Sequence, residues 1–250
     1  MNPAASHARW PFPRVIAHRG GGTLAPENTL AAIRTGHRLG CRAVEFDVVL
    51  AGDGVPVLMH DDTVDRTTNG HGCVSDLDSG ALSRLDAGNW HGAAFKGEPV
   101  PTFEAAARLC VTLGLWANVE IKPAQGREVD TGRLAAMMAR DTWRNAAIPP
   151  LLSSFLPHAL IAAHEAAPEL PLGLLFDAVP SDWQRQLETL HCISLHCNAA
   201  KLTGAVARDI VAAGYGLAAW TVNDPAEARQ LFTIGVDAIF TDRPDQISRA

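Results

Sequence analysis

Short apolar runs alternate with longer amphipathic stretches along nearly the whole chain. Short runs rich in apolar and β-branched residues are typical of buried strands, and amphipathic stretches are typical of helices. The pattern predicts strands at Val15–His18, Ala43–Val49, Trp116–Ile121, Leu151–Ser154, Leu172–Phe176, Cys192–His196, Leu217–Val222 and Ala238–Thr241. It predicts helices between them, for example at Asn28–Leu39, Thr102–Leu113 and Ala205–Ala213.

This alternation favours an α/β fold with a parallel sheet closed into a (β/α)8, or TIM, barrel. The chain has 250 residues, and barrels of this type run to about 250 residues as one unit. We therefore expect one domain over residues 1–250, with residues 1–13 as an extended N-terminal tail. Residues 62–99 have little periodicity and exceed an ordinary loop, so we predict a small insertion over the barrel mouth.

One apolar run, Pro56–His60, follows the second predicted strand too closely to be its parallel neighbour. Parallel neighbours need a crossover of about a dozen residues, whereas Asp53-Gly54 is typical of a tight reversal. We therefore predict an antiparallel hairpin near the barrel mouth. Symmetric pairing about the turn would place His60 near Asp47.

The charge of the chain limits the kinds of partner that we expect. The net charge is −6 and the sequence contains no run of Lys and Arg, so a nucleic-acid partner is not expected. A small anionic substrate remains compatible with this charge, because a bound cation can reverse the local potential.

The five cysteines show no CxxC spacing, which is typical of a protein whose thiols stay reduced. No apolar run spans a membrane or resembles a signal peptide, so we expect a cytoplasmic protein; the sequence does not indicate its oligomeric state.

Acidic and apolar side chains alternate over residues 44–48, within the second predicted strand. Since successive side chains of a strand point to opposite faces, Glu45 and Asp47 share one face and the apolar residues share the other. If the apolar face packs on helices, the two carboxylates point into the barrel, where they repel each other and lose hydration. A bound cation would relieve both costs. An exposed strand with an ordinary polar face is the alternative.

The strand predicted at Trp116–Ile121 repeats this arrangement, with Asn118, Glu120 and Lys122 on one face. Glu120 offers a third oxygen ligand, and Lys122 places a cation beside it. Ligation by oxygen suits a hard metal such as Mg²⁺ or Ca²⁺, so we predict one divalent ion. A Glu–Lys pair that only balances charge is the alternative here.

Two histidines, His18 and His60, stand where predicted strands end. TIM barrels place their active sites at the carboxyl ends of strands. General acid–base catalysis of a substitution reaction needs one proton removed from the nucleophile and another donated to the leaving group. Imidazole titrates near neutral pH, so this pair suits the task.

Glycine and aromatic residues near other strand ends are less specific. Gly20–Gly22 follow the first predicted strand, but they match neither GxGxxG nor a P-loop, and a flexible turn explains them equally well. Phe155 and Trp220 also stand near predicted strand ends. Each either lines a pocket or packs in the core.

Together these motifs resemble those of the glycerophosphodiester phosphodiesterase family. The resemblance runs from Arg14 to about Asp245, and the motifs follow the family's order and spacing. They are residues 18–20, 26–29, 45–47, 53–54 with 60–61, 66–70, 120–123, 154–155, 220–223 and 241–244.

The resemblance implies a TIM barrel with a small insertion. It also implies metal-dependent hydrolysis of glycerophosphodiesters, such as glycerophosphocholine, to sn-glycerol 3-phosphate and an alcohol. The implied roles are metal ligation by Glu45, Asp47 and Glu120, acid/base catalysis by His18 and His60, phosphate binding by Arg19 and Lys122, and pocket formation by Phe155 and Trp220.

Two further functions fit the same scaffold. A lysophospholipase D or a sphingomyelinase-D-like enzyme would act on lipids and would need an apolar entry surface, which residues 62–99 do not show. A non-catalytic ligand-binding barrel is disfavoured because every expected catalytic position is filled.

Overall fold

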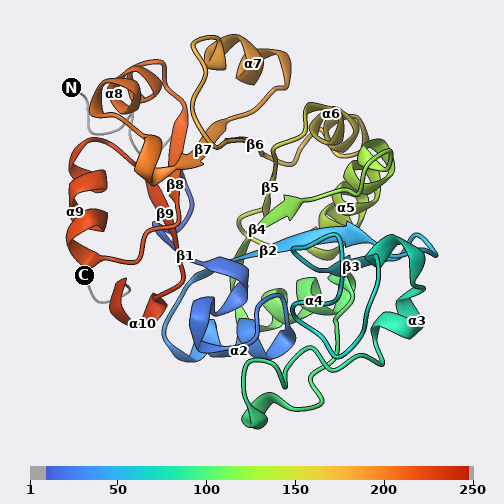
Figure 1. Cartoon of the computed structure of the whole chain (residues 1–250). Coiled ribbons are helices and arrows are strands. Elements are labelled where there is room, and N and C mark those ends of the chain that lie inside the picture. The colour runs from blue at the N-terminus through green and yellow to red at the C-terminus, as the bar shows by residue number, and fades with distance from the viewer. Residues whose placement is uncertain (1–9, 248–250) are drawn as a thin grey trace.

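The computed structural model describes residues 10–247, and a closed ring of eight parallel strands stands at its centre (Figure 1). β1 pairs with both β2 and β9, which closes the ring. The ring strands are β1 Val15–Ala17, β2 Ala43–Leu50, β4 Trp116–Ile121, β5 Leu151–Ser154, β6 Leu172–Phe176, β7 Ser194–Asn198, β8 Gly216–Trp220 and β9 Ala238–Thr241. The predicted TIM barrel is therefore confirmed.

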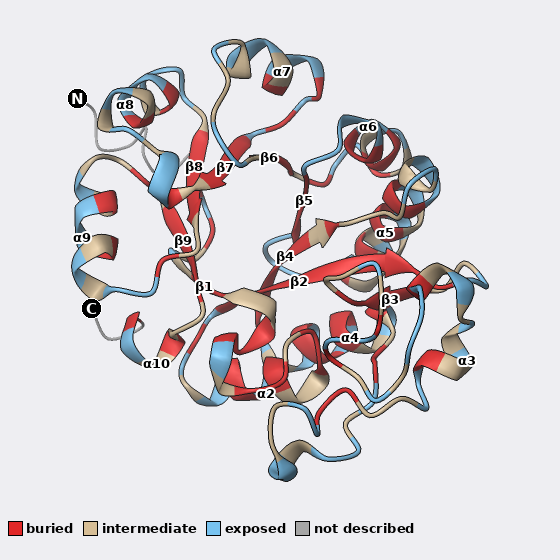
Figure 2. Cartoon of the chain, in the orientation of Figure 1, coloured by how far each residue is buried: buried red, intermediate tan, exposed pale blue. Residues whose placement is uncertain are grey.

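Helices surround the ring, and Figure 2 shows that they turn buried residues toward the strands. The α-helices are α2 Leu30–Arg38, α3 Ser79–Leu82, α4 Phe103–Leu113, α5 Glu128–Thr142, α6 Pro157–Ala166, α7 Trp183–Thr189, α8 Gly204–Ala212, α9 Pro225–Thr233 and α10 Pro244–Ile247. Short 3₁₀ turns are η1 His18–Gly20, η2 Gly22–Leu24, η3 Val74–Asp76, η4 Ala93–Phe95 and η5 Ala199–Lys201. None of the helices between residues 10 and 247 is both long and apolar enough to cross a lipid bilayer.

The predicted hairpin is present and sets the position of His60. β3, Pro56–Leu58, pairs antiparallel with β2, with Val48 opposite Leu58. The backbone N–H of Met59 then donates to the Asp47 carbonyl at 3.2 Å. His60 therefore leaves the hairpin at the level of the Asp47 side chain, and both residues line the same cavity.

Some strand boundaries differ from the prediction for local reasons. His18 is not in β1, because the chain turns there into η1. The seventh strand begins at Ser194 rather than Cys192, because the Cys192 N–H bonds to the Leu187 carbonyl and completes the end of α7. The eighth strand ends at Trp220, two residues early, where a cis peptide bond leads to Thr221.

The alternation within β2 divides apolar and acidic side chains as predicted. Val44, Phe46 and Val48 are fully buried in the layer between strands and helices, where Phe46 packs on Phe103 of α4. The strands thus keep an apolar outer face, and the acidic inner face points into the barrel.

Aromatic residues that precede β1 cover one end of the barrel. Trp10 and Phe12 are buried, and Phe12 stacks on Trp116 with 4.6 Å between ring centroids. Trp10 also packs edge-on against His196 inside the barrel. Of the expected tail, residues 1–9 lie outside the described residues, whereas residues 10–13 pack against the strands.

The insertion at residues 62–99 has only short helical turns and a small core of its own. Val64, Val74 and Leu82 are buried with Val57 and Met59 of the hairpin. The segment lies beside β3, α2 and α4, at one side of the barrel mouth rather than across it (Figure 1).

Candidate active site

A cavity of about 220 Å³ lies at the carboxyl ends of the barrel strands. It brings together every site residue predicted from the sequence, namely His18, Arg19, Glu45, Asp47, His60, Glu120, Lys122, Phe155 and Trp220. These residues come from six strands or strand ends and extend from position 18 to position 220 of the chain. The barrel therefore assembles in one place what the sequence disperses.

Three carboxylates converge on the floor of this cavity. The register of β2 and β4 places Asp47 beside Glu120, and Glu45 lies one inward position earlier. Each offers an oxygen, and the three oxygens lie within 4.8 Å of one another. Glu45 and Asp47 are each only 2% exposed. No other group of three or more potential ligands of this kind occurs within residues 10–247.

The electrostatics of this cluster favour a bound cation. Burial, together with the charges of Asp47 and Glu120, raises the pKa of Glu45 well above its usual value. Burial and the Asp47 charge raise the pKa of Glu120 to about 8. Oε1 of Glu45 and Oδ1 of Asn118 are buried without a hydrogen-bond partner. An all-oxygen donor set with excess negative charge fits a divalent metal such as Mg²⁺ or Ca²⁺.

Asn28 fixes the orientation of Asp47. Its Nδ2 donates to Oδ2 of Asp47 at 2.8 Å, and its Oδ1 accepts from the Asp47 backbone N–H at 3.0 Å. Asn28 has a positive φ of 56°, a conformation that Asn tolerates better than most residues. The Asn28 side chain therefore holds the Asp47 carboxylate in place through one hydrogen bond to the carboxylate and one from the Asp47 backbone.

Arg19 reaches the cluster from a strained backbone. Its φ is 50°, which is uncommon for a non-glycine residue and is retained where neighbouring contacts stabilise it. Its N–H donates to Oε2 of Glu45 at 2.8 Å, and its carbonyl accepts from Asn28 at 3.0 Å. Burial opposes the guanidinium charge, but the nearby charges of Asp47 and Glu27 outweigh this and raise the Arg19 pKa.

His18 is oriented by Asp242 from the other end of the chain. Nδ1 of His18 and Oδ1 of Asp242 are 2.7 Å apart, so Nε2 faces the cavity and lies 3.9 Å from Oε2 of Glu45. The loop after β1 touches Asp242 closely: the Thr23 N–H bonds to the Asp242 carbonyl at 2.9 Å. A Cβ on Gly22 would lie 2.2 Å from that carbonyl oxygen. Glycine is thus required here for close packing.

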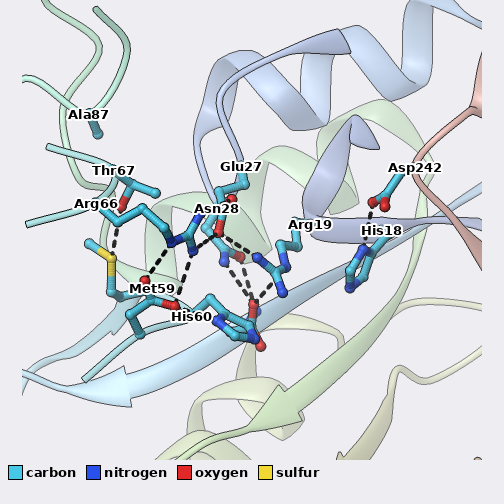
Figure 3. Close-up of polar contacts among 12 residues, drawn as sticks. His18, Arg19, Glu27, Asn28, Met59, His60, Arg66, Thr67, Ala87 and Asp242 are labelled. Carbon is cyan, nitrogen blue, oxygen red and sulfur yellow. Dashed lines mark hydrogen bonds and ion pairs between the residues drawn. The ribbon is translucent and has the colours of Figure 1, made fainter. Parts of the chain in front are cut away.

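His60 belongs to a network of charged side chains, in which Figure 3 labels His60, Arg66, Glu27 and Arg19. Nδ1 of His60 lies 2.6 Å from Oδ1 of Asp61. Asp61 is held in turn by Arg66 of the insertion, and Arg66 also forms two 2.8 Å bonds to Glu27. Glu27 accepts from Arg19 at 2.7 Å. The network therefore joins His60 to Arg19 through the insertion.

Burial lowers the pKa of His60, and the charges of Arg19 and Lys122 lower it further, although Asp47 and Asp61 act in the opposite direction. The imidazole therefore remains neutral at neutral pH. A neutral imidazole held at Nδ1 by a carboxylate presents Nε2 as a proton acceptor.

Aromatic side chains form the apolar wall of the cavity. Phe155 and Trp220 pack edge-to-face with 5.9 Å between their centroids. Phe155 is 41% exposed at the rim, and Leu175 and Phe240 continue the wall inward. The cavity thus has an apolar wall on one side and polar residues, among them the carboxylates, the histidines, Arg19 and Lys122, on the rest of its lining.

Sequence reasoning assigned no role to five residues that complete the site, namely Glu27, Asn28, Asp61, Arg66 and Asp242. All five lie within motifs that carried the family resemblance. Their function depends on contacts between distant segments, which neither periodicity nor spacing reveals.

Comparison with known proteins agrees with this geometry. Residues 18–246 match the model of the glycerophosphoryl diester phosphodiesterase family. The chain belongs to this family. It is therefore a phosphodiesterase, that is, a phosphoric diester hydrolase, as its motifs indicated.

Individual members of the glycerophosphoryl diester phosphodiesterase family match over almost their full length. A glycerophosphodiester phosphodiesterase from Caldanaerobacter subterraneus subsp. tengcongensis is 34% identical, over 93% of this chain and 95% of its own. A phosphodiesterase from Oleispira antarctica, solved with its product sn-glycerol-3-phosphate, is 38% identical with a TM-score of 0.91, and 98% of each chain is covered. A glycerophosphodiester phosphodiesterase from Agrobacterium tumefaciens is 28% identical with a TM-score of 0.81, over 96% of this chain and 100% of its own.

Proposed function

We propose that this protein hydrolyses glycerophosphodiesters, such as glycerophosphocholine, to sn-glycerol 3-phosphate and an alcohol, with one divalent ion, Mg²⁺ or Ca²⁺. The observation that carries the proposal is the cavity in which three converging carboxylates face two histidines, each held by its own carboxylate. The Oleispira antarctica relative, which binds sn-glycerol-3-phosphate, supports the same chemistry.

In this proposal Glu45, Asp47 and Glu120 hold the metal, which when bound supplies positive charge to the phosphoryl group. Arg19 and Lys122 bind other phosphoryl oxygens and stabilise the charge that builds on them. The fixed backbone of Arg19 orients its guanidinium before substrate arrives, which lowers the entropic cost of binding.

The two histidines transfer the protons. One takes a proton from the nucleophile, and the other donates a proton to the oxygen of the departing alcohol. Asp242 and Asp61 hold Nδ1 of His18 and His60 respectively, so both rings present Nε2 to the substrate. The nucleophile is either the neighbouring glycerol hydroxyl, which gives a cyclic phosphate that water opens, or water itself.

Phe155 and Trp220 would exclude water from one side of the phosphoryl group and contact the carbon atoms of the glycerol. Exclusion of water strengthens the interaction of Arg19 and Lys122 with the phosphoryl oxygens.

Release of sn-glycerol 3-phosphate from glycerophosphocholine, with Mg²⁺, with Ca²⁺ and with a chelator, tests the function. Metal-dependent release is expected. Folded protein that releases none with either metal would contradict the proposal. Lysophosphatidylcholine assayed in parallel distinguishes the lipid-diester alternative, and trapping of a cyclic phosphate from a slow variant distinguishes the two nucleophiles.

A further inference from the structure

A second cavity of about 500 Å³ adjoins the first, a size typical of small-molecule sites. His18, Arg19 and Thr221 line both cavities and so form the boundary between them. The remaining walls come from the segment after β1, from Asp242 after β9, and from the insertion, which contributes Arg66, Trp90 and His91. None of the roles assigned above uses this space.

The insertion presents the Trp90 ring as a fixed aromatic wall. Trp90 is 42% exposed, and its Nε1 donates to the Ala87 carbonyl at 2.8 Å. The neighbouring His91 ring meets Trp90 at 84° and bonds through Nε2 to the Thr23 carbonyl at 3.0 Å. The wall is thus joined to the loop after β1, and the partly exposed Trp90 side chain lines the cavity.

Each carboxylate that lines this second cavity already has at least one partner. Glu27 accepts hydrogen bonds from Arg19 and Arg66, and Asp242 is paired with His18. A ligand that needs strong hydrogen-bond acceptors would have to compete with these contacts (Figure 3). A ligand that needs only an aromatic face would not.

A glycerophosphodiester carries two groups on its phosphoryl centre, the glycerol arm and the alcohol arm. The two cavities offer a separate space for each. The smaller cavity holds the metal-binding carboxylates and both histidines, so it must take the phosphoryl group and the glycerol hydroxyl beside it. The ester oxygen that joins the phosphoryl group to the alcohol arm then points across the boundary formed by His18 and Arg19. The larger cavity lies there and is suited to the arm that varies between substrates.

We infer that the second cavity binds the alcohol arm of the diester and that Trp90 makes it selective for an alcohol that ends in a methylated ammonium group, such as choline. The inference rests on the proposed function and adds a substrate class to it. Indole is the best aromatic partner for a quaternary ammonium. A primary ammonium, as in ethanolamine, carries three N–H donors that need acceptors, and for these it would compete with Arg19, Arg66 and His18.

The test compares glycerophosphocholine with glycerophosphoethanolamine as substrates of the wild-type enzyme and of Trp90→Ala and Trp90→Phe, each with metal. We expect the wild type to prefer the choline substrate in kcat/KM. Trp90→Ala should lose about 3- to 30-fold on that substrate, with less than about 2-fold on the ethanolamine substrate. Trp90→Phe should fall between, because its ring is a weaker cation–π partner.

Val111→Ala, which trims a 44% exposed side chain on α4, is the matched control and should change neither substrate. Tetramethylammonium gives a second readout, the inhibition constant against glycerophosphocholine, which is independent of the size of kcat. It should compete with glycerophosphocholine in the wild type and compete less well in Trp90→Phe.

Equal losses on both substrates would overturn the subsite, because they would mark Trp90 as structural. A wild type without choline preference, or without competition by tetramethylammonium, would overturn the ligand class. A wild type that hydrolyses neither substrate with either metal would instead refute the proposed function, and the subsite with it.

Discussion

Arg66 holds Asp61 by two hydrogen bonds, from Nε to Oδ2 at 2.6 Å and from Nη2 to Oδ1 at 3.1 Å. The Arg66 bonds, with help from His60, lower the pKa of Asp61 far below its usual value. Asp61 therefore stays ionised and fixes Nδ1 of His60 as a donor. Because Arg66 belongs to the insertion, the insertion sets the geometry of a histidine on the hairpin.

Replacement of Arg66 by Met should lower kcat by about 10- to 100-fold, because His60 and Arg19 both lose their indirect anchor and small displacements of reacting groups are costly. Metal affinity should change little, since Arg66 contacts none of Glu45, Asp47 and Glu120. Arg66→Lys keeps the charge without the planar fork and should be intermediate. Steady-state kinetics and metal titration of each variant provide the measurements.

Arg133→Met is the control for Arg66, since Arg133 is exposed on α5 and pairs with Asp130. Its kinetics should equal those of the wild type. An Arg66→Met enzyme with wild-type kcat would show that the network has no part in positioning His60.

Glu45→Gln should abolish metal binding and lower activity by about 100-fold or more. Its Tm in chelator should be unchanged or higher, since the variant removes repulsion among the three clustered carboxylates. Calorimetric metal titration and thermal unfolding would be compared with Glu104→Gln, an exposed acid on α4. A Glu45→Gln protein that is metal-replete and active would rule out this ligand.

Metal binding should strengthen as the pH rises toward about 8. Burial and the Asp47 charge raise the pKa of Glu120 from 4.5 to about 8, so without metal the folded protein carries a proton that a metal must displace. Affinity should rise by at most about tenfold per pH unit for each proton released. Calorimetry in buffers of different ionisation enthalpy would count the protons, and Glu120→Gln should flatten the dependence.

The raised pKa of Glu120 also sets the direction in which the free energy of unfolding changes with pH in the absence of metal. Between pH 4.5 and about 8 the folded state binds more protons than the unfolded state, because the pKa of Glu120 is raised. The free energy of unfolding should therefore fall as the pH rises through this window. Urea unfolding in chelator at several pH values checks this. A free energy that rises over the same window would contradict the assigned environment of Glu120.

His18 and His60 should respond differently to the quality of the leaving group. His18 lines both cavities, whereas His60 lines only the first, so we expect His18 to protonate the alcohol. The activity of His18→Ala should then be largely restored with a p-nitrophenyl diester, whose leaving group needs no proton. His60→Ala should remain slow on both substrates. The opposite pattern would exchange the two roles.

Much of the fold follows from local pattern. The barrel strands appear in the sequence as short apolar runs, and Asp53-Gly54 predicts the hairpin that places His60. The carboxylate pair follows from the two-residue period of a strand. These features depend on a few neighbouring residues and on the geometry of one element, so the sequence predicts them directly.

The contacts that complete the site follow from closure of the barrel instead. Glu27 meets Arg66 from 39 positions away, and the aromatic pair of Phe12 and Trp116 forms only when the first segment folds under the strands. No local rule relates such positions. The insertion shows this most clearly, because its lack of periodicity predicts a loop and gives no sign that Arg66 orients His60 through Asp61.

The carboxylate of Asp242 lies 224 positions after the histidine that it orients. It follows β9, the strand that closes the ring against β1. A growing chain therefore makes His18, the first of the two proposed catalytic histidines, early, but Asp242 cannot orient it until the last strand has been synthesised and has paired. Hydrolytic activity in this protein would thus serve as a direct reporter of ring closure, and a partly folded or truncated intermediate would be chemically silent.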